Sequence, residues 1–286
     1  MQSFNFHQHT YRCKHADFGM TDKEYIEEYL KMGNFKKIAF TDHCPEKEVI
    51  DTRDRMRMSY DERIEYLEEI EHLKEEYKDK IEVLAGYEIE YLPGQEENLQ
   101  ELKAETDILV LGQHFIYDKD GKNLKIIKDH KIAYDDIDMD TYASYIETAM
   151  KLGLPDIVAH PDLFMKAKDS FDEICEKTTR RICEASVKYN VTLEINLNNI
   201  FGKIFLNKKD KTIKSLTVKE QEELLPMVDY PNKDFWKIAS EYDIKVVYGI
   251  DTHFRNQIPL YNDLVRLANE IIGEEAIDKL NFIEEM

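Results

Sequence analysis

The stretch FNFHQHTYRCKHADFG, residues 4–19, contains three of the nine histidines of this 286-residue chain. Its apolar opening predicts a β-strand that runs into the H-x-H pair His7 and His9. Side chains two positions apart on a strand point to the same face, so these two imidazoles would project together. His15 follows after a short loop and can fold back toward them. This arrangement is typical either of a solvated, titrating cluster or of a metal site, because a shared face suits chelation by two nitrogens.

Apolar segments like this first one recur along the chain, and longer segments of helical periodicity separate them. In the segment 61–77, for example, Ile64, Leu67, Ile70 and Leu73 recur at intervals of three and four, which predicts an amphipathic helix. The segments 20–33 and 230–242 also predict helices. The predicted strands span 4–9, 37–43, 81–90, 107–114, 156–161, 191–196 and 244–253. Strands that alternate with helices pair in parallel, so we expect an α/β fold whose seven strands form a closed or nearly closed barrel.

Each predicted strand carries a histidine or a carboxylate at or beyond its end. In parallel α/β barrels the C-terminal strand ends face one mouth, where functional sites are built. The residues are His7, His9, His43, Glu88, His114, His160, Glu194, Asp251 and His253. Apart from His15 in the opening stretch, only two histidines lie elsewhere, and we expect His72 to be a surface residue and His130 a plain loop residue. The joint placement predicts metal binding.

Three neighbouring residues have a less direct connection with the predicted metal site. Glu194 could be a ligand or could orient one, and we favour the orienting role. Cys13 and Cys44 lie near the cluster, and thiolates do bind zinc. Because seven imidazoles are available, we expect packing roles for both cysteines.

The balance of charge restricts the ligands of this chain. Lys and Arg number 39 against 59 Asp and Glu, a formal net charge of −20, which argues against broad contact with nucleic acid. An anionic substrate would need a local positive charge. The predicted ligands are too many for one metal ion and suffice for two or three. Three divalent ions together with the carboxylates of Glu88 and Asp251 would leave a local charge of about +4.

Other signals favour a soluble cytoplasmic enzyme. We find no signal peptide and no apolar run of membrane-spanning length, and the four cysteines include no C-x-x-C pair.

The phosphate-cradling loops G-x-x-x-x-G-K-[ST] and G-x-G-x-x-G and the G-x-S-x-G elbow are absent. H-x-H also opens amidohydrolase barrels, but these usually place a lysine at a mid-barrel strand end, where this chain has Glu88 and His114.

The motifs HQHTYRCKHA, IAFTDHCP, GYEIEY, LGQHF, VAHPDLF, LEIN and YGIDTH occur in this order. With them the chain resembles the PHP (polymerase and histidinol phosphatase) superfamily over nearly its whole length. The C-x-H-A element at Cys13 to Ala16 is similar to the histidinol-phosphate phosphatase branch. The resemblance implies a distorted seven-stranded (β/α)7 barrel, a single domain over 1–286, with a trinuclear metal site at the C-terminal strand ends. The lysine-rich segment 201–221 has no clear match, and we expect a rim excursion or a solvated loop there.

The resemblance also implies how the donors divide among three ions of zinc, manganese or iron. The first ion would be held by His7, His9, Glu88 and Asp251. Glu88 would bridge to the second ion, held also by His114 and His160. The third would be held by His15, His43 and His253.

The implied reaction is hydrolysis of a phosphate monoester, L-histidinol phosphate. Asp17 would protonate the leaving alkoxide, or it would simply cap its loop. Arg255 would clamp the phosphate through a bidentate contact. The alternatives are hydrolysis of another small phosphate ester, 3′–5′ exonuclease activity, and a non-catalytic metal-binding module.

Overall fold

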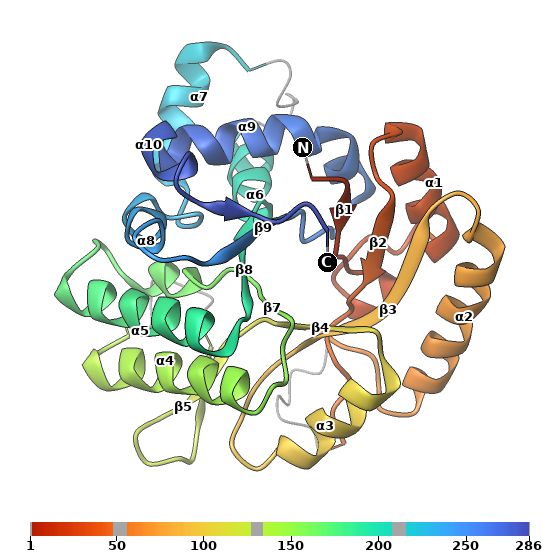
Figure 1. The fold of residues 1–286 in the computed structure, drawn as a ribbon, viewed down its shortest axis with the longest axis horizontal. Coiled ribbons are helices and arrows are strands. Elements are labelled where there is room, and N and C mark those ends of the chain that lie inside the picture. The colour runs from red at the N-terminus through yellow and green to blue at the C-terminus, as the bar shows by residue number, and fades with distance from the viewer. Residues whose placement is uncertain (1, 48–55, 127–133, 208–215, 286) are drawn as a thin grey trace.

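The computed structural model describes residues 2–47, 56–126, 134–207 and 216–285. Its main sheet has eight strands in the order β1-β2-β3-β4-β7-β8-β9-β10, and every neighbouring pair is parallel (Figure 1). The strands are β1 (Phe4–Asn5), β2 (Lys37–Phe40), β3 (Glu82–Ile89), β4 (Ile108–Leu111), β7 (Ile157–Val158), β8 (Thr192–Asn196), β9 (Lys245–Gly249) and β10 (Asn281–Phe282). A separate antiparallel hairpin pairs β5 (Phe115–Tyr117) with β6 (Leu124–Ile126).

Helices surround the strands (Figure 1). They are α1 (Asp22–Met32), α2 (Glu62–Tyr77), α3 (Glu96–Glu105), α4 (Asp136–Lys151), α5 (Glu173–Tyr189), α6 (Asn198–Asn207), α7 (Val218–Leu224), α8 (Lys233–Ala239), α9 (Tyr261–Ile272) and α10 (Glu274–Ile277). Short 3-10 helices follow β1 (η1, Tyr11–Cys13), β7 (η2, Leu163–Ala167), α7 (η4, Leu225–Met227) and β9 (η5, Arg255–Leu260). No helix in the described ranges is both long enough and apolar enough to cross a membrane.

The first and last parts of the sheet meet, so that the sheet curls into a barrel. Beyond β1 and β9 the chain forms a parallel bridge between Gln8 and Thr252, in which the His9 amide donates to the Thr252 carbonyl at 2.9 Å. At the opposite end β10 pairs with β9, and the side chain of Gln2 bonds to both main-chain groups of Tyr248. The predicted α/β barrel is therefore confirmed.

Several details of the prediction are wrong. The main sheet has eight strands and not seven, because β10 is too short to show a period in the sequence. In α2, Ile64 is 56% exposed, and Tyr66 occupies the buried face instead. The segment 201–221 begins as helix, since α6 extends to Asn207 with Phe201 and Ile204 buried, while residues 208–215 lie outside the described part. The single-domain organisation stays a prediction.

The interior of the barrel contains two layers of side chains. The lower layer is apolar and comprises Phe4, Phe6, Ala39, Ile108, Val110, Ile157, Ala159 and Val247. These residues come from five strands and contact one another, because alternate side chains of each strand face inward. Above them, toward the C-terminal strand ends, the inward positions are glycine or carry polar side chains. The apolar layer therefore supports a polar one.

A buried carboxylate links α8 to the segment after β7. Asp162 is fully buried, and its Oδ2 accepts hydrogen bonds from the Asn232 amide at 2.6 Å and from the Trp236 indole at 3.1 Å. Its Oδ1 has no hydrogen-bond partner. Burial raises the pKa of Asp162 to about 7.

This pKa predicts a pH-dependent effect of the substitution Asp162→Asn. Between the unfolded pKa, about 3.9, and the folded value, the folded protein binds more protons, so the stability contributed by this group falls as pH rises. Asparagine keeps an oxygen acceptor and carries no charge. We expect Asp162→Asn to raise the Tm of EDTA-treated protein relative to the unsubstituted protein at pH 8 and to do so much less at pH 5. Equal differences in thermal unfolding at the two pH values would contradict this.

Candidate metal centre

The structure brings together all nine side chains that the sequence predicted as metal ligands. Each lies within or just beyond the C-terminal end of a strand of the barrel, except His15, which lies on the loop after η1. They are His7, His9, His15, His43, Glu88, His114, His160, Asp251 and His253, and ring contacts or ion pairs connect every one of them to the others.

Glu88 lies at the centre of the cluster. Its side chain is 1% exposed and is surrounded by imidazole nitrogens from the ends of four strands. The nitrogen–oxygen distances are 2.8 Å for His43, 3.1 Å for His160, 3.4 Å for His9, 3.5 Å for His7 and 3.6 Å for His114. A buried carboxylate is stable only when it is paired, and here neutral or charged imidazoles are the partners.

Asp251 forms a second acidic point on the opposite side of His7 and His9. Its Oδ1 lies 3.2 Å from His9 and 3.5 Å from His7, and 3.2 Å from His253. Its backbone φ is 51°, in the left-handed region, and His160 likewise has φ 30°. Non-glycine residues rarely adopt this conformation, and it is concentrated at functional sites. At both positions the backbone turns away from the strand direction at the residue whose side chain belongs to the cluster.

Several donor atoms of the cluster lack partners that a protein group would normally supply. Glu88 Oε2 and Asp251 Oδ1 have close imidazole nitrogens but no hydrogen bond of good geometry, and His160 Nδ1 is buried without a hydrogen bond. Two pairs of ring nitrogens also face each other, His7 with His9 at 3.2 Å and His15 with His253 at 2.8 Å. Buried polar atoms are almost always satisfied, so these unmatched acceptors fit an ion between them. Mixed imidazole and carboxylate donors suit zinc, manganese and iron.

The donors form more than one group of the right size. In each group one ligand atom per residue lies within 4.8 Å of the others. Within the cluster of nine, the groups are His9 with His43 and His253; His7 with His9 and Glu88; His7 with His160 and Asp251; and His43 with Glu88 and His114. His7, His9, His43 and Glu88 each belong to two of these groups, so the groups overlap.

Electrostatics favours the protonation states that metal ligands need in three imidazoles and in both carboxylates of the cluster. Burial, with the neighbouring imidazoles, lowers the pKa of His15 to about 3 and lowers the pKa of His9 and of His43, so their lone pairs are free at neutral pH. Burial alone would raise the pKa of Glu88 and Asp251, but the surrounding imidazoles hold both well below the usual range. Both carboxylates are therefore charged at neutral pH. In His7, His114 and His253 burial alone would lower the pKa, but the neighbouring carboxylates raise it.

Residues behind the cluster orient its imidazoles. Glu194 accepts from His7 Nδ1 at 2.9 Å, which agrees with the orienting role favoured from the sequence. Glu90 does the same for His114 Nδ1 at 3.1 Å, and it also accepts the Phe115 amide at 2.7 Å. The sequence analysis did not identify Glu90, although it directly follows the end of β3 and lies two positions after Glu88.

Two glycines make room for these carboxylates. A Cβ atom at Gly112 would lie 1.8 Å from Glu88 Oε1, and one at Gly249 would lie 2.0 Å from Glu194 Oε2. Contacts this short do not occur, so any larger residue at either position would displace a carboxylate. The cluster therefore requires glycine at positions 112 and 249 in addition to its nine donor side chains.

The two predicted catalytic residues outside the cluster have other surroundings. The Asp17 carboxylate accepts the Gly19 amide at 3.0 Å, the loop-capping contact that was the alternative to an acid role. Arg255 is exposed at the start of η5, and its charge reaches Glu24 on α1, whose pKa is lowered by hydrogen bonds from Thr21 and further by Arg255. Both roles stay predictions.

The sequence analysis missed two residues near the cluster, Tyr230 and Lys166, and placed two histidines outside it. The buried ring of Tyr230 lies 5.9 Å from the ring of His160, and the Lys166 ammonium lies 5.2 Å above Tyr230. No periodicity or motif marks either residue. His72 is exposed on α2, as predicted, and His130 lies outside the described residues.

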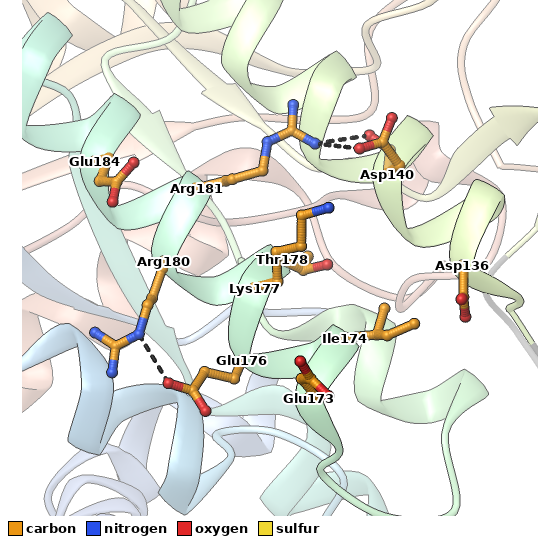
Figure 2. A pocket seen from close by; sticks show the side chains of 10 residues that line it. All are labelled: Asp136, Asp140, Glu173, Ile174, Glu176, Lys177, Thr178, Arg180, Arg181 and Glu184. Carbon is orange, nitrogen blue, oxygen red and sulfur yellow. Dashed lines mark hydrogen bonds and ion pairs between the residues drawn. The ribbon is translucent and has the colours of Figure 1, made fainter.

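A surface groove of about 750 Å³ between α4 and α5 differs from the cluster in its chemistry (Figure 2). Its arginines are already paired: Arg181 with Asp140 at 2.8 Å, and Arg180 with Glu176 at 2.9 Å. None of the nine donors lines it. We therefore place the candidate site at the barrel mouth and not in this groove.

Comparison with known proteins gives matches to one family. A PHP domain model matches residues 5–198. The chain is 27% identical over 163 residues to a Deinococcus radiodurans protein named "Probable histidinol-phosphatase", with 55% of this chain and 59% of that protein covered. It is 31% identical over 102 residues to the histidinol-phosphatase of Bacillus subtilis, with 35% and 37% covered. The matches thus span less than two thirds of these relatives' length.

Two solved structures share the fold. A Listeria monocytogenes protein, provisionally assigned as a histidinol phosphatase, superposes with a TM-score of 0.70 at 20% identity, covering 89% of this chain and 97% of that one. The Lactococcus lactis histidinol phosphate phosphatase, solved with zinc, L-histidinol and phosphate, gives a TM-score of 0.64 at 16% identity, with 93% and 94% covered. At these identities the similarity establishes the fold alone.

The glycine contacts predict that Gly249→Ala weakens metal binding. The new methyl group must push Glu194 away and so release His7, and loss of such an orienting partner typically costs roughly 10- to 100-fold in metal affinity. Zinc titration against a competing chelator measures this. The matched control is Gly202→Ala in α6, where a Cβ meets no atom within 4 Å and the zinc affinity should not change. Equal zinc affinities for the two variants would contradict the prediction.

Proposed function

This chain belongs to the PHP domain family, and from that premise we propose that it is a metal-dependent phosphomonoesterase that hydrolyses L-histidinol phosphate to L-histidinol and phosphate. The observation that carries the proposal is the cluster of nine donors around the buried carboxylates of Glu88 and Asp251. The choice of substrate is supported by the two relatives named as histidinol-phosphatases.

We assign the nine donors to three divalent ions of zinc, manganese or iron. Such ions, when bound, supply Lewis acidity toward phosphate oxygens and toward water. The residues of the chain hold the geometry: Glu88 lies between the imidazoles of four strands, and Asp251 fixes the side toward His253. Unmatched buried acceptors and more than one three-residue group support more than one ion.

The cluster also supports an anionic substrate on an acidic protein. The formal net charge of −20 repels a phosphate ester at long range. Three divalent ions against two ligand carboxylates would reverse the sign locally, to about +4. Arg255, at the start of η5, is proposed to add a bidentate contact to phosphate. The same balance of charge makes nucleic acid a poor partner, and the four buried free cysteines fit a reduced, cytoplasmic setting.

The departing alcohol needs a proton, and we assign Asp17 to this role. Its loop is tied to the cluster because the Asp17 amide donates to the His253 carbonyl at 2.8 Å. The carboxylate is half-buried and also accepts the Gly19 amide. A general acid contributes typically about 10²- to 10⁴-fold to the rate.

The first test is phosphate release by zinc- or manganese-loaded protein from L-histidinol phosphate, p-nitrophenyl phosphate and single-stranded DNA. We expect a kcat/KM of about 10⁴ M⁻¹s⁻¹ or more for L-histidinol phosphate, in the range of true enzyme–substrate pairs, and far less for the other two. Weak, similar rates on both esters would refute the substrate, and efficient DNA degradation would favour an exonuclease. Glu88→Gln should abolish activity, whereas the surface variant His72→Ala should keep it.

The substitution Asp17→Asn separates the two roles of this residue. Asparagine can still accept the Gly19 amide, so the Tm should be unchanged, but it cannot give up a proton. We expect kcat to fall at least about 100-fold and the basic limb of its pH profile to disappear. Steady-state kinetics from pH 5 to pH 9 measure both. An unaltered kcat and pH profile would leave Asp17 with the loop-capping role alone.

A further inference from the structure

Cys13 is fully buried at the end of η1, directly behind the cluster. Its sulfur has three polar partners on two different segments, one after β1 and one after β2. It accepts from His9 Nδ1 at 3.2 Å and from the His43 amide at 3.2 Å, and it donates to Asp42 Oδ1 at 2.8 Å. The packing role expected from the sequence is therefore incomplete, because every hydrogen-bonding capacity of the thiol is used.

The direction of these bonds follows from the partners. Both oxygens of Asp42 already act as acceptors, one for the Thr10 amide at 2.7 Å and the other for the Thr10 hydroxyl at 2.8 Å. The sulfur, 2.8 Å from a carboxylate oxygen, must therefore carry the hydrogen of that contact. Its lone pairs are then left for the two N–H groups, so His9 donates from Nδ1.

His9 is the imidazole for which this bond has the largest consequence. Its other nitrogen, Nε2, lies 3.2 Å from Asp251 and 3.4 Å from Glu88, the two carboxylates of the cluster. A proton on Nδ1 leaves the Nε2 lone pair directed between them. The thiol thus sets both the tautomer and the tilt of the ring that faces both acidic points.

We propose that Cys13 is a positioning residue of the metal centre, whose thiol fixes His9 as the tautomer with a free Nε2 and ties the ends of β1 and β2 together. The inference rests on the metal site proposed above and not on the substrate. It also accounts for the grouping of His9, Cys13 and Asp42 within 4.8 Å without a further ion. An ion there would need a thiolate and a second deprotonated nitrogen on His9, while Asp42 is already saturated by donors.

The test compares Cys13→Ala and Cys13→Ser with Cys183→Ala, a matched control on α5 where the cysteine is equally buried in the apolar core. The probe is zinc alone, titrated against a chelator, with no substrate. We expect Cys13→Ala to weaken zinc binding roughly 10- to 100-fold, Cys13→Ser to recover much of the loss because a hydroxyl can also accept and donate, and Cys183→Ala to bind as the unsubstituted protein does. Unchanged affinity in Cys13→Ala, or equal losses in both alanine variants, would overturn the proposal.

A second readout is independent of affinity. In ¹⁵N-histidine-labelled, zinc-loaded protein, His9 should show a proton on Nδ1, and Cys13→Ala should shift or lose that resonance. If Cys13→Ala does not fold, Cys13→Ser decides: a changed Nδ1 resonance supports the role, since oxygen replaces sulfur as acceptor, and an unchanged one overturns it. If the unsubstituted protein binds zinc but leaves L-histidinol phosphate intact, the proposed substrate fails while the role of Cys13 is still tested.

Discussion

The structure depends on one buried negative charge, the carboxylate of Glu88, at the centre of five imidazoles. An isolated carboxylate at this depth would be strongly unfavourable, so the barrel must bring partners to it from several strands at once. Gly112 on the neighbouring segment must lack a side chain for the same reason, because a methyl group there would occupy the space of Glu88 Oε1. The need to pair the buried carboxylate of Glu88 therefore constrains both the arrangement of the strands and the composition of the site.

The closure of the barrel explains how residues 240 positions apart share one site. The Gln8–Thr252 bridge holds the end of β1 beside the end of β9, which sets His7 and His9 against Asp251. The apolar layer beneath fixes the height at which these ends emerge, since close-packed side chains from five strands leave little freedom to slide. Hydrophobic packing below and polar pairing above thus specify the register together.

Much of this could be predicted from the sequence, for a definite physical reason. The strand period of two and the parallel topology together place strand-end residues at one mouth, and eight of the nine donors of the cluster lie there; His15 reaches it from the loop after the first strand. Contacts made across strands leave no local pattern: Glu90 beneath His114 and Gly249 opposite Glu194 follow only from three-dimensional proximity. Cys13 follows His9 by four positions, but no periodicity marks their contact. The strand β10 could not be predicted because two residues are too few to show an alternating pattern.

Four imidazoles of the cluster contact protein groups through the ring nitrogen that faces away from its centre. Where one ring nitrogen faces the centre, the other contacts a protein group: Glu194 for His7, Cys13 for His9, Glu90 for His114 and the Asp251 carbonyl for His253. Each contact fixes a tautomer and a ring angle through a different acceptor, so no single substitution behind the cluster releases them all. His160 differs, because its Nε2 contacts Glu88 while its Nδ1 is buried without a partner. A centre built in this way needs little reorganisation to receive ions, because the lone pairs are aimed by the protein and not by the metal.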